Sequence, residues 1–151
     1  MTKKIFIVST LFFALTATYA QKAENLCCQD IRSHEKMMTI DEAISRKATV
    51  YALDLSLQHP KLTSAPEALA KLTYLRCLNL SFNRVSTFPP SFKNLQNLTC
   101  LDLSGNHHLQ RLPDFFAEMP NLKIIRMEDL NWTSARRQEI EARFPNITFE
   151  W

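Results

Sequence analysis

The fold of this chain is decided by residues 75–85, which read LRCLNLSFNRV. Leucines occupy the first, fourth and sixth positions of this stretch, an asparagine the ninth and a valine the eleventh. The same spacing returns 23 residues later in residues 98–106, which read LTCLDLSGN, and the next leucine, Leu109, arrives one position late. A repeat of this length indicates stacked copies of one structural unit.

Each copy continues into a second pattern, in which an apolar residue and a proline are followed by apolar residues at three-residue intervals. This pattern occurs in residues 65–72, 88–95 and 112–119. Weaker copies of the first pattern begin at Val50 and Leu122, as expected of end repeats that cap a stack. We therefore predict repeats over residues 50–72, 73–95, 96–119 and 120–144.

The first half of each repeat has the pattern of a strand with one buried face, because apolar and polar residues alternate in 78–80 and 101–103. A return of about twenty residues between strands makes the sheet parallel. Pro66, Pro89 and Pro113 fit the first position of a short helical turn. The predicted class is α/β, a short solenoid with a concave parallel sheet of about four to five strands and short convex helices or turns.

These residues resemble the leucine-rich-repeat family, whose signature Leu-x-x-Leu-x-Leu-x-x-Asn-x-Leu recurs every 20 to 29 residues. The resemblance covers residues 50–151, and the second pattern is similar to the Leu-Pro-x-x-Phe/Leu-x-x-Leu convex segments of small exported bacterial-type members. It implies that Gln58, Asn83 and Asn106 form a structural ladder along the solenoid. The alternative, that they are ordinary turn residues, also makes them structural.

Both ends of the solenoid require covers, and the sequence offers a helix for each. Thr39 and Glu42 have the spacing of a capping box, and Ile40 with Ile44 gives one apolar face, which predicts a cap helix at about residues 40–47. A second cap helix and a last edge strand complete a leucine-rich-repeat domain of residues 39–151. Their predicted ranges are Ser134–Arg143 and residues 147–151.

The first twenty residues are predicted to be a cleavable signal peptide. Lys3 and Lys4 precede an apolar run that begins at Ile5, and small residues before Gln21 suit a peptidase that cuts after Ala20. A membrane anchor is the alternative, but the run falls short of the roughly 20 residues that cross a bilayer. We expect an exported protein, periplasmic, cell-surface or secreted, without membrane insertion after cleavage. Its N-terminal segment, residues 21–38, need not be ordered.

Composition bounds the function. The 151 residues are 46% hydrophobic and 22% charged, which suits one globular unit. Removal of Lys3 and Lys4 from the 18 basic residues leaves 16, against 15 acidic residues. This near-neutral balance lacks the basic footprint of nucleic-acid binding.

The sequence shows no catalytic or metal-binding pattern. The four cysteines and four histidines lack the close paired spacing of a zinc site. Gly105 is the single glycine, which excludes glycine-rich phosphate loops, and no nucleophile stands beside a base in a recognisable motif. We therefore expect no enzyme activity, no metal and no cofactor.

Cys77 and Cys100 occupy the same position in consecutive repeats, one residue before an inward leucine. Neighbouring strands would hold their Cα atoms about 4.8 Å apart, inside the disulfide range of about 4.4–6.8 Å, although parallel strands keep Cβ atoms further apart than a bridge prefers. A disulfide and two separate thiols both remain open, as does the pairing of Cys27 and Cys28.

The repeat register also predicts the side chains of the concave surface, which in repeat proteins serves binding. Our first hypothesis is therefore a module that binds a protein or peptide through this surface. The alternatives are a redox or thiol surface at Cys77 and Cys100, and a structural piece of a cell-surface assembly. The predicted binding residues are Asp54, Ser56, Leu57, Asn79, Ser81, Phe82, Asp102, Ser104, Arg126 and Glu128.

Overall fold

The computed structural model describes residues 39–45 and 50–151. The signal peptide, the segment 21–38 and the last two residues of the predicted N-terminal cap helix lie outside the described residues. In chain order the elements are α3 (Ile40–Ser45), β1 (Ala52–Asp54), η3 (Glu67–Lys71), β2 (Cys77–Asn79), η4 (Pro90–Asn94), β3 (Cys100–Asp102), η5 (Asp114–Glu118), β4 (Ile124–Arg126), α4 (Ser134–Arg143) and β5 (Thr148–Glu150).

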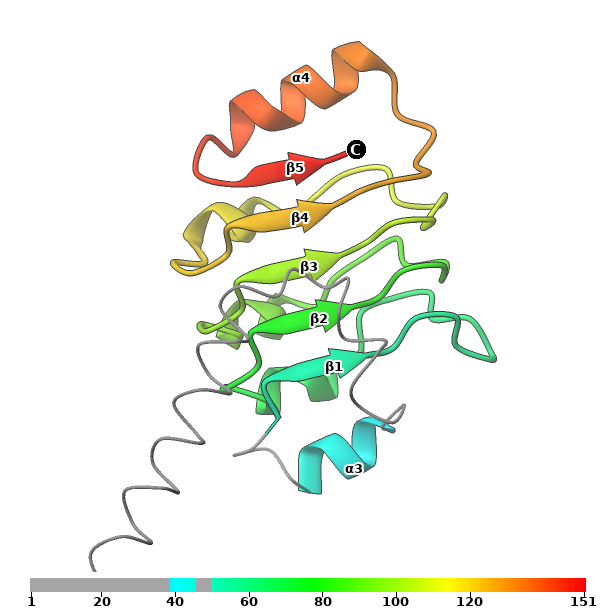
Figure 1. The fold of residues 1–151 in the computed structure, drawn as a ribbon, viewed down its shortest axis with the longest axis vertical. Coiled ribbons are helices and arrows are strands. Elements are labelled where there is room, and N and C mark those ends of the chain that lie inside the picture. The colour runs from blue at the N-terminus through cyan, green and yellow to red at the C-terminus, as the bar shows by residue number, and fades with distance from the viewer. Residues whose placement is uncertain (1–38, 46–49) are drawn as a thin grey trace, which may run out of the picture.

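The strands form one parallel sheet in the order β1-β2-β3-β4-β5, and each neighbour in space is also the neighbour in sequence. Figure 1 shows the strands stacked along the long axis, with their connections passing behind the sheet. In the register, Leu53 lies opposite Leu78, Leu78 opposite Leu101, and Leu101 opposite Ile125. The prediction of a short α/β leucine-rich-repeat solenoid is confirmed.

The core is a continuous row of buried leucines behind the sheet, supported by phenylalanines on the convex side. Phe88 lies edge-on to Phe92 and to Phe116, with ring centroids 5.2 and 5.1 Å apart. Phe92 and Phe116 are themselves almost fully buried. Edge-to-face contacts of this kind add about 0.5–1.5 kcal/mol per pair beyond the buried area. The second half of each repeat therefore adds buried aromatic contacts to the leucine core.

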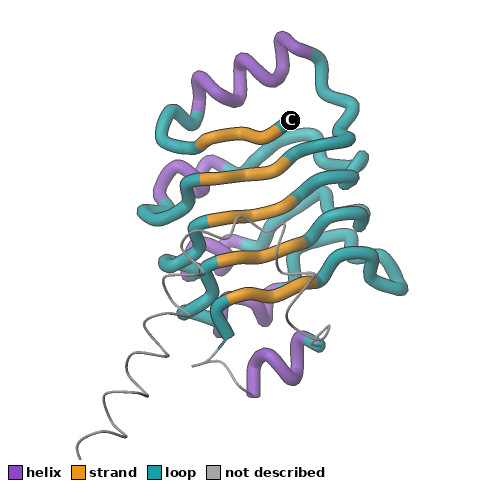
Figure 2. The backbone as a smooth tube through the Cα atoms, in the orientation of Figure 1, coloured by secondary structure: helices purple, strands orange, loops and turns teal. Residues whose placement is uncertain are grey.

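The convex segments are short 3₁₀ helices, one in each of three repeats (Figure 2). Pro66, Pro89 and Pro113 take the N-cap of these helices, with φ near −65° and ψ between 131° and 149°. Our prediction of the first helical position was therefore wrong by one residue. The extended ψ explains the difference, because each proline ends the incoming extended segment before the turn begins.

The two end helices cover the stack at opposite ends (Figure 1). In α3 the backbone N–H of Thr39 donates to Glu42 Oε2 at 2.9 Å, and the backbone N–H of Glu42 donates to Thr39 Oγ1 at 3.2 Å, which is the reciprocal capping box. In α4 the Thr133 hydroxyl caps the helix, while Ile140 and Phe144 enter the core. No helix of the described residues is long and apolar enough to cross a membrane.

Candidate functional site

Asn83 and Asn106 hold successive repeats together from inside the turns. The Nδ2 group of Asn83 donates to the backbone oxygen of Leu55 in the preceding repeat at 2.8 Å, and that of Asn106 donates to Leu80 O at 3.0 Å. Gln58 has a smaller part, since its side chain reaches only Ser56 O in its own turn. Its backbone N–H instead donates to Asn83 Oδ1 at 3.3 Å.

A second ladder runs along the opposite margin of the sheet, and the sequence analysis missed it. Asn97 Nδ2 donates to Thr73 O at 2.8 Å, and Asn121 Nδ2 donates to Gln96 O at 2.8 Å. Each asparagine directly precedes the first leucine of its repeat. Their equivalent positions in consecutive repeats were visible in the sequence and could have predicted this ladder. These two ladders leave neither asparagine set available as a binding group.

The register brings the predicted polar column together on the concave face, with Asp54 opposite Asn79, Asn79 opposite Asp102, and Asp102 opposite Arg126. The first three side chains turn back onto their own chain. Asp54, Asn79 and Asp102 each accept a hydrogen bond, through Oδ1 at 2.9 Å, from the backbone N–H two residues later. These side chains therefore shape the end of each strand.

This geometry changes the expected binding surface. We predicted that the strand columns would face a partner, but most of their residues are buried. The carboxylate and amide oxygens lie against backbone donors, and the short serines sit between rows one strand spacing apart. The buried members are Ser56, Asn79, Ser81, Asp102, Ser104 and Arg126.

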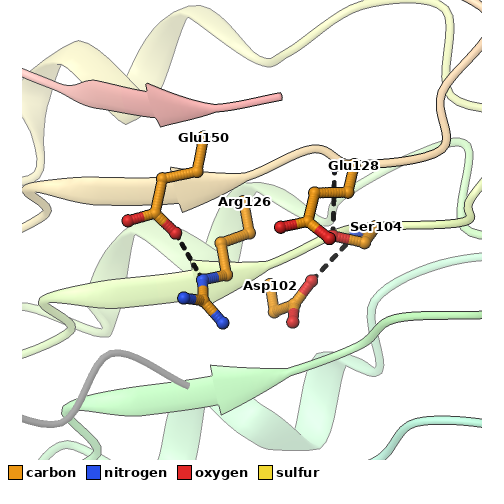
Figure 3. A network of polar contacts seen from close by, with 5 residues as sticks. All are labelled: Asp102, Ser104, Arg126, Glu128 and Glu150. Atoms are coloured by element: carbon orange, nitrogen blue, oxygen red, sulfur yellow. Dashed lines mark hydrogen bonds and ion pairs between the residues drawn. The ribbon is translucent and has the colours of Figure 1, made fainter. Parts of the chain in front are cut away.

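The C-terminal end of the concave face carries a polar network (Figure 3). Arg126 Nε lies 2.5 Å from Glu150 Oε2, and the backbone N–H of Glu128 donates to Ser104 Oγ at 3.2 Å. The Glu128 side chain itself is exposed. The arginine charge is thus neutralised locally, while the Glu128 carboxylate remains available to solvent.

The exposed part of the face lies one residue beyond the strand columns, in a row called here the turn row. It consists of the exposed residues Leu57, Phe82 and Asp129 and the buried Gly105. All four residues have positive φ, at 53°, 54°, 67° and 55°. The backbone N–H of Leu57 donates to Ser81 O at 3.1 Å, and the next two members donate in the same way. Leu57 is 53% exposed and Phe82 is 38% exposed.

Phe82 lies on a platform that only glycine provides. A Cβ atom added to Gly105 would stand 2.6 Å from Phe82 Cδ1, closer than carbon atoms approach. The backbone oxygen of Phe82 also accepts a 2.5 Å hydrogen bond from Lys61 Nζ. The ring therefore rests directly on the neighbouring backbone, at a fixed height above the sheet.

Beside Phe82 an open groove of about 670 Å³ runs toward the C-terminal cap. At its far wall the Arg137 guanidinium stacks on the Trp151 ring, 5.1 Å from the centroid. Arg137 Nε is buried there with no hydrogen-bond partner among the described residues. The groove, called here the end groove, is lined by Phe82, His107, Glu128, Asp129, Leu130, Asn131, Arg137 and Trp151.

The end groove could not be read from the repeat register, because its walls come from elements far apart in the sequence. Phe82 and Glu128 were predicted as binding residues, whereas Arg137 was assigned only to the cap helix and Trp151 only to the last edge strand. Aromatic and cationic side chains on a terminal cap are only a weak sequence signal for a binding site. They indicate one here because the fold places them beside an exposed turn. The site thus combines the apolar side chains of Leu57 and Phe82 with exposed carboxylates and one guanidinium.

Cys77 and Cys100 lie opposite each other in the register, both almost fully buried, and no disulfide joins them. In-register parallel strands hold the two side chains at the strand spacing, which is wider than a disulfide prefers. Among the described residues, no group of three or more His, Cys, Asp or Glu side chains could hold a metal ion.

Comparisons with known proteins agree with this fold. Residues 75–117 match the family model described as leucine rich repeats in two copies. A solved leucine-rich-repeat protein of Leptospira interrogans superposes with a TM-score of 0.59 and 23% sequence identity, covering 72% of this chain and 27% of that one. This chain thus corresponds to about a quarter of that protein's length. No curated protein matches the sequence.

Proposed function

We propose that this chain, a leucine-rich-repeat protein by its repeats and its fold, is a non-enzymatic module that binds a protein or peptide at its concave face. Leucine-rich repeats generally serve protein interaction, and their concave surfaces are the usual place of contact. The contact here is the turn row together with the end groove, in place of the strand columns themselves.

The observation that carries this proposal is the choice of side chains at the left-handed positions. A residue other than glycine or asparagine at positive φ costs about 1 kcal/mol or more. Full exposure of a large apolar side chain forgoes roughly a further 1.5–3 kcal/mol of burial, and a half-exposed one forgoes about half of that. Leu57 and Phe82 incur both costs in neighbouring repeats, side by side on one face. A partner that covers both side chains would recover the burial.

The groove chemistry defines the partner class. An apolar side chain of the partner would pack on Leu57 and Phe82. Glu128 and Asp129 are exposed carboxylates beyond them and would pair with a lysine or arginine of the same segment. We therefore propose an extended peptide segment that carries an apolar residue followed by a basic one.

The proposed module neither binds nucleic acid nor catalyses a reaction, and it acts after export. The near-neutral charge disfavours nucleic-acid binding, and no catalytic constellation accompanies the groove. Export across a membrane, with cleavage after Ala20, follows from the basic and apolar pattern of the first twenty residues. The partner would then be another exported or surface protein.

The test uses a random peptide library selected on the immobilised full chain, followed by Kd measurements on the enriched peptides by calorimetry. Phe82→Ala should weaken binding by about thirtyfold or more, because a central apolar contact is worth about 2 kcal/mol. Replacing Glu128 with Gln should weaken peptides that carry a basic residue and leave neutral variants of those peptides unchanged.

The matched control is Tyr74→Ala. Tyr74 is a large apolar residue of similar exposure, at 51%, but it precedes its strand and so lies away from the turn row. Its loss should leave Kd unchanged. Equal affinities for the wild type, Phe82→Ala and Tyr74→Ala would refute binding at this surface, and so would a library that yields no enriched sequence.

A further inference from the structure

Arg137 is a cation of the end groove that the described part of the chain leaves without an ion pair. Its side chain donates no hydrogen bond to another described residue, and its Nε is buried without a partner. Other arginines at the C-terminal end of the solenoid do pair with carboxylates, namely Arg126 with Glu150, Arg136 with Glu139, and Arg143 with Asp114. The Arg137 charge therefore lacks the neutralising partner that its neighbours have.

The aromatic ring beside the Arg137 guanidinium fixes its position at the groove wall. The guanidinium carbon lies over the Trp151 ring, 5.1 Å from its centroid. That ring is itself held, because Trp151 Nε1 donates to Glu141 Oε1 at 2.7 Å and the ring stacks on Phe149. The ring attracts the positive charge but offers no oxygen to the N–H donors. Since Nε is buried, an incoming acceptor would meet the terminal Nη groups.

The charges around Arg137 select the kind of acceptor. Glu128 and Asp129 are exposed carboxylates of the same groove, so two negative charges and one positive charge give these three residues a net charge of −1. A phosphate dianion would meet strong repulsion from both carboxylates. A carboxylate carries less charge and matches the planar fork of a guanidinium. A basic group next to it on the same ligand would offset the repulsion from Glu128 and Asp129.

We propose that Arg137 binds a carboxylate of the bound peptide, next to the basic residue of that peptide. This inference rests on the proposed function, because it takes the peptide as the occupant of the end groove. The peptide carboxylate accepts hydrogen bonds from the Nη groups of Arg137, while the basic side chain lies against Glu128 and Asp129. An acidic side chain and a free C terminus both supply such a carboxylate, and the test separates them.

The test uses synthetic libraries of random octapeptides with a fixed Phe-Lys pair, selected on the immobilised full chain. One library has an amidated C terminus and no Asp or Glu. A second differs only in its free C-terminal carboxylate, and a third keeps the amide and adds one Glu. Calorimetry then compares each enriched peptide with its matched amide or Gln form. The wild type should bind the carboxylate form about tenfold to a hundredfold more tightly, as expected of hydrogen bonds between charged groups.

Arg137→Gln should abolish this preference, so that the carboxylate and uncharged forms bind with similar Kd. The matched control is Arg136→Gln, in the same helix. Arg136 lies over the Trp132 ring at 5.5 Å and already pairs with Glu139, so its loss should leave the preference intact. Thermal melting checks that each variant is folded. If Arg137→Gln is not, Arg137→Lys replaces it, and this variant should retain only part of the preference because it lacks the fork.

The preference for a carboxylate separates this site from a purely structural role of Arg137. The proposal is overturned if the wild type binds both forms equally, or if Arg137→Gln keeps the preference. Phe82→Ala, measured on the same peptides, tests the proposed function separately. If Phe82→Ala weakens binding while no carboxylate preference exists, the carboxylate site alone is wrong. If the preference depends on Arg137 while Phe82→Ala has no effect, the apolar contact alone is wrong. A failure of all three libraries to yield an enriched peptide overturns both.

Discussion

Replacing Asn106 with Ala should strongly destabilise the solenoid. The Asn106 side chain is fully buried. Its Nδ2 group donates to the backbone oxygens of Leu80, Leu103 and Ser104 at 3.0, 2.9 and 3.4 Å, and its Oδ1 accepts from the backbone N–H of Val85 at 2.8 Å. An alanine leaves all four backbone groups without this partner.

The size of the loss follows from those four contacts. The two Nδ2 hydrogens and the Oδ1 acceptor make three full hydrogen bonds, which at a net contribution of about 1 kcal/mol each give about 3 kcal/mol, and the long 3.4 Å contact adds little. Buried groups left unsatisfied act in the same direction. We therefore expect Asn106→Ala to lose about 3–5 kcal/mol, a large part of the 5–15 kcal/mol typical of a domain. In a small domain 1 kcal/mol lowers Tm by roughly 4–8 °C, so Tm should fall by at least about 10 °C.

Urea unfolding followed by circular dichroism measures this loss, with two controls. Asn131→Ala changes an exposed asparagine beside the corresponding position of the last repeat, and should stay within about 0.5 kcal/mol of the wild type. Asn97→Ala removes one exposed hydrogen bond and should cost about 1 kcal/mol. The reasoning is refuted if Asn106→Ala unfolds within about 1 kcal/mol of Asn131→Ala.

Three further predictions concern Gly105 beneath the Phe82 ring, the N-cap of helix α4 and the signal peptide. Gly105→Ala should lower stability by about 1–3 kcal/mol and weaken the selected peptides, because φ is +67° and the new methyl displaces the Phe82 ring; unchanged Kd in calorimetry would contradict this. Thr133→Ala should cost about 1 kcal/mol in urea unfolding, since its hydroxyl caps α4; a loss near zero would contradict the cap. N-terminal sequencing of the exported protein should begin at Gln21, and a sequence that begins at Met1 would exclude cleavage.

The sequence was sufficient to predict the architecture, because the leucine spacing allows only one way to bury the apolar residues. With Leu78 and Leu80 facing inward, every other strand residue must face the concave side, and the 23-residue offset then aligns neighbouring repeats. The cap helix α4 was predicted with its observed bounds, since residues 134–143 contain no helix breaker and Pro145 follows Phe144 in the sequence.

The details of the site depended on side-chain contacts that the repeat pattern does not predict. The register placed Asp102 on the concave face, but it could not say that the carboxylate would bind its own backbone and leave the surface. It also gave no sign that the Phe82 ring would lie beside Trp151, which follows it by about three repeat lengths. Contacts between repeats and caps arise only when the folded stack brings distant segments of the chain together.

Hydrogen–deuterium exchange of the full chain, with and without a selected peptide, tests the proposed docking surface most directly. Bound peptide should slow exchange in the peptide fragments that contain Leu57, Phe82 and Asp129, and leave the convex helix η4 unchanged. Protection confined to the convex helices, with the turn row exchanging as in the unbound protein, would contradict binding at the concave face.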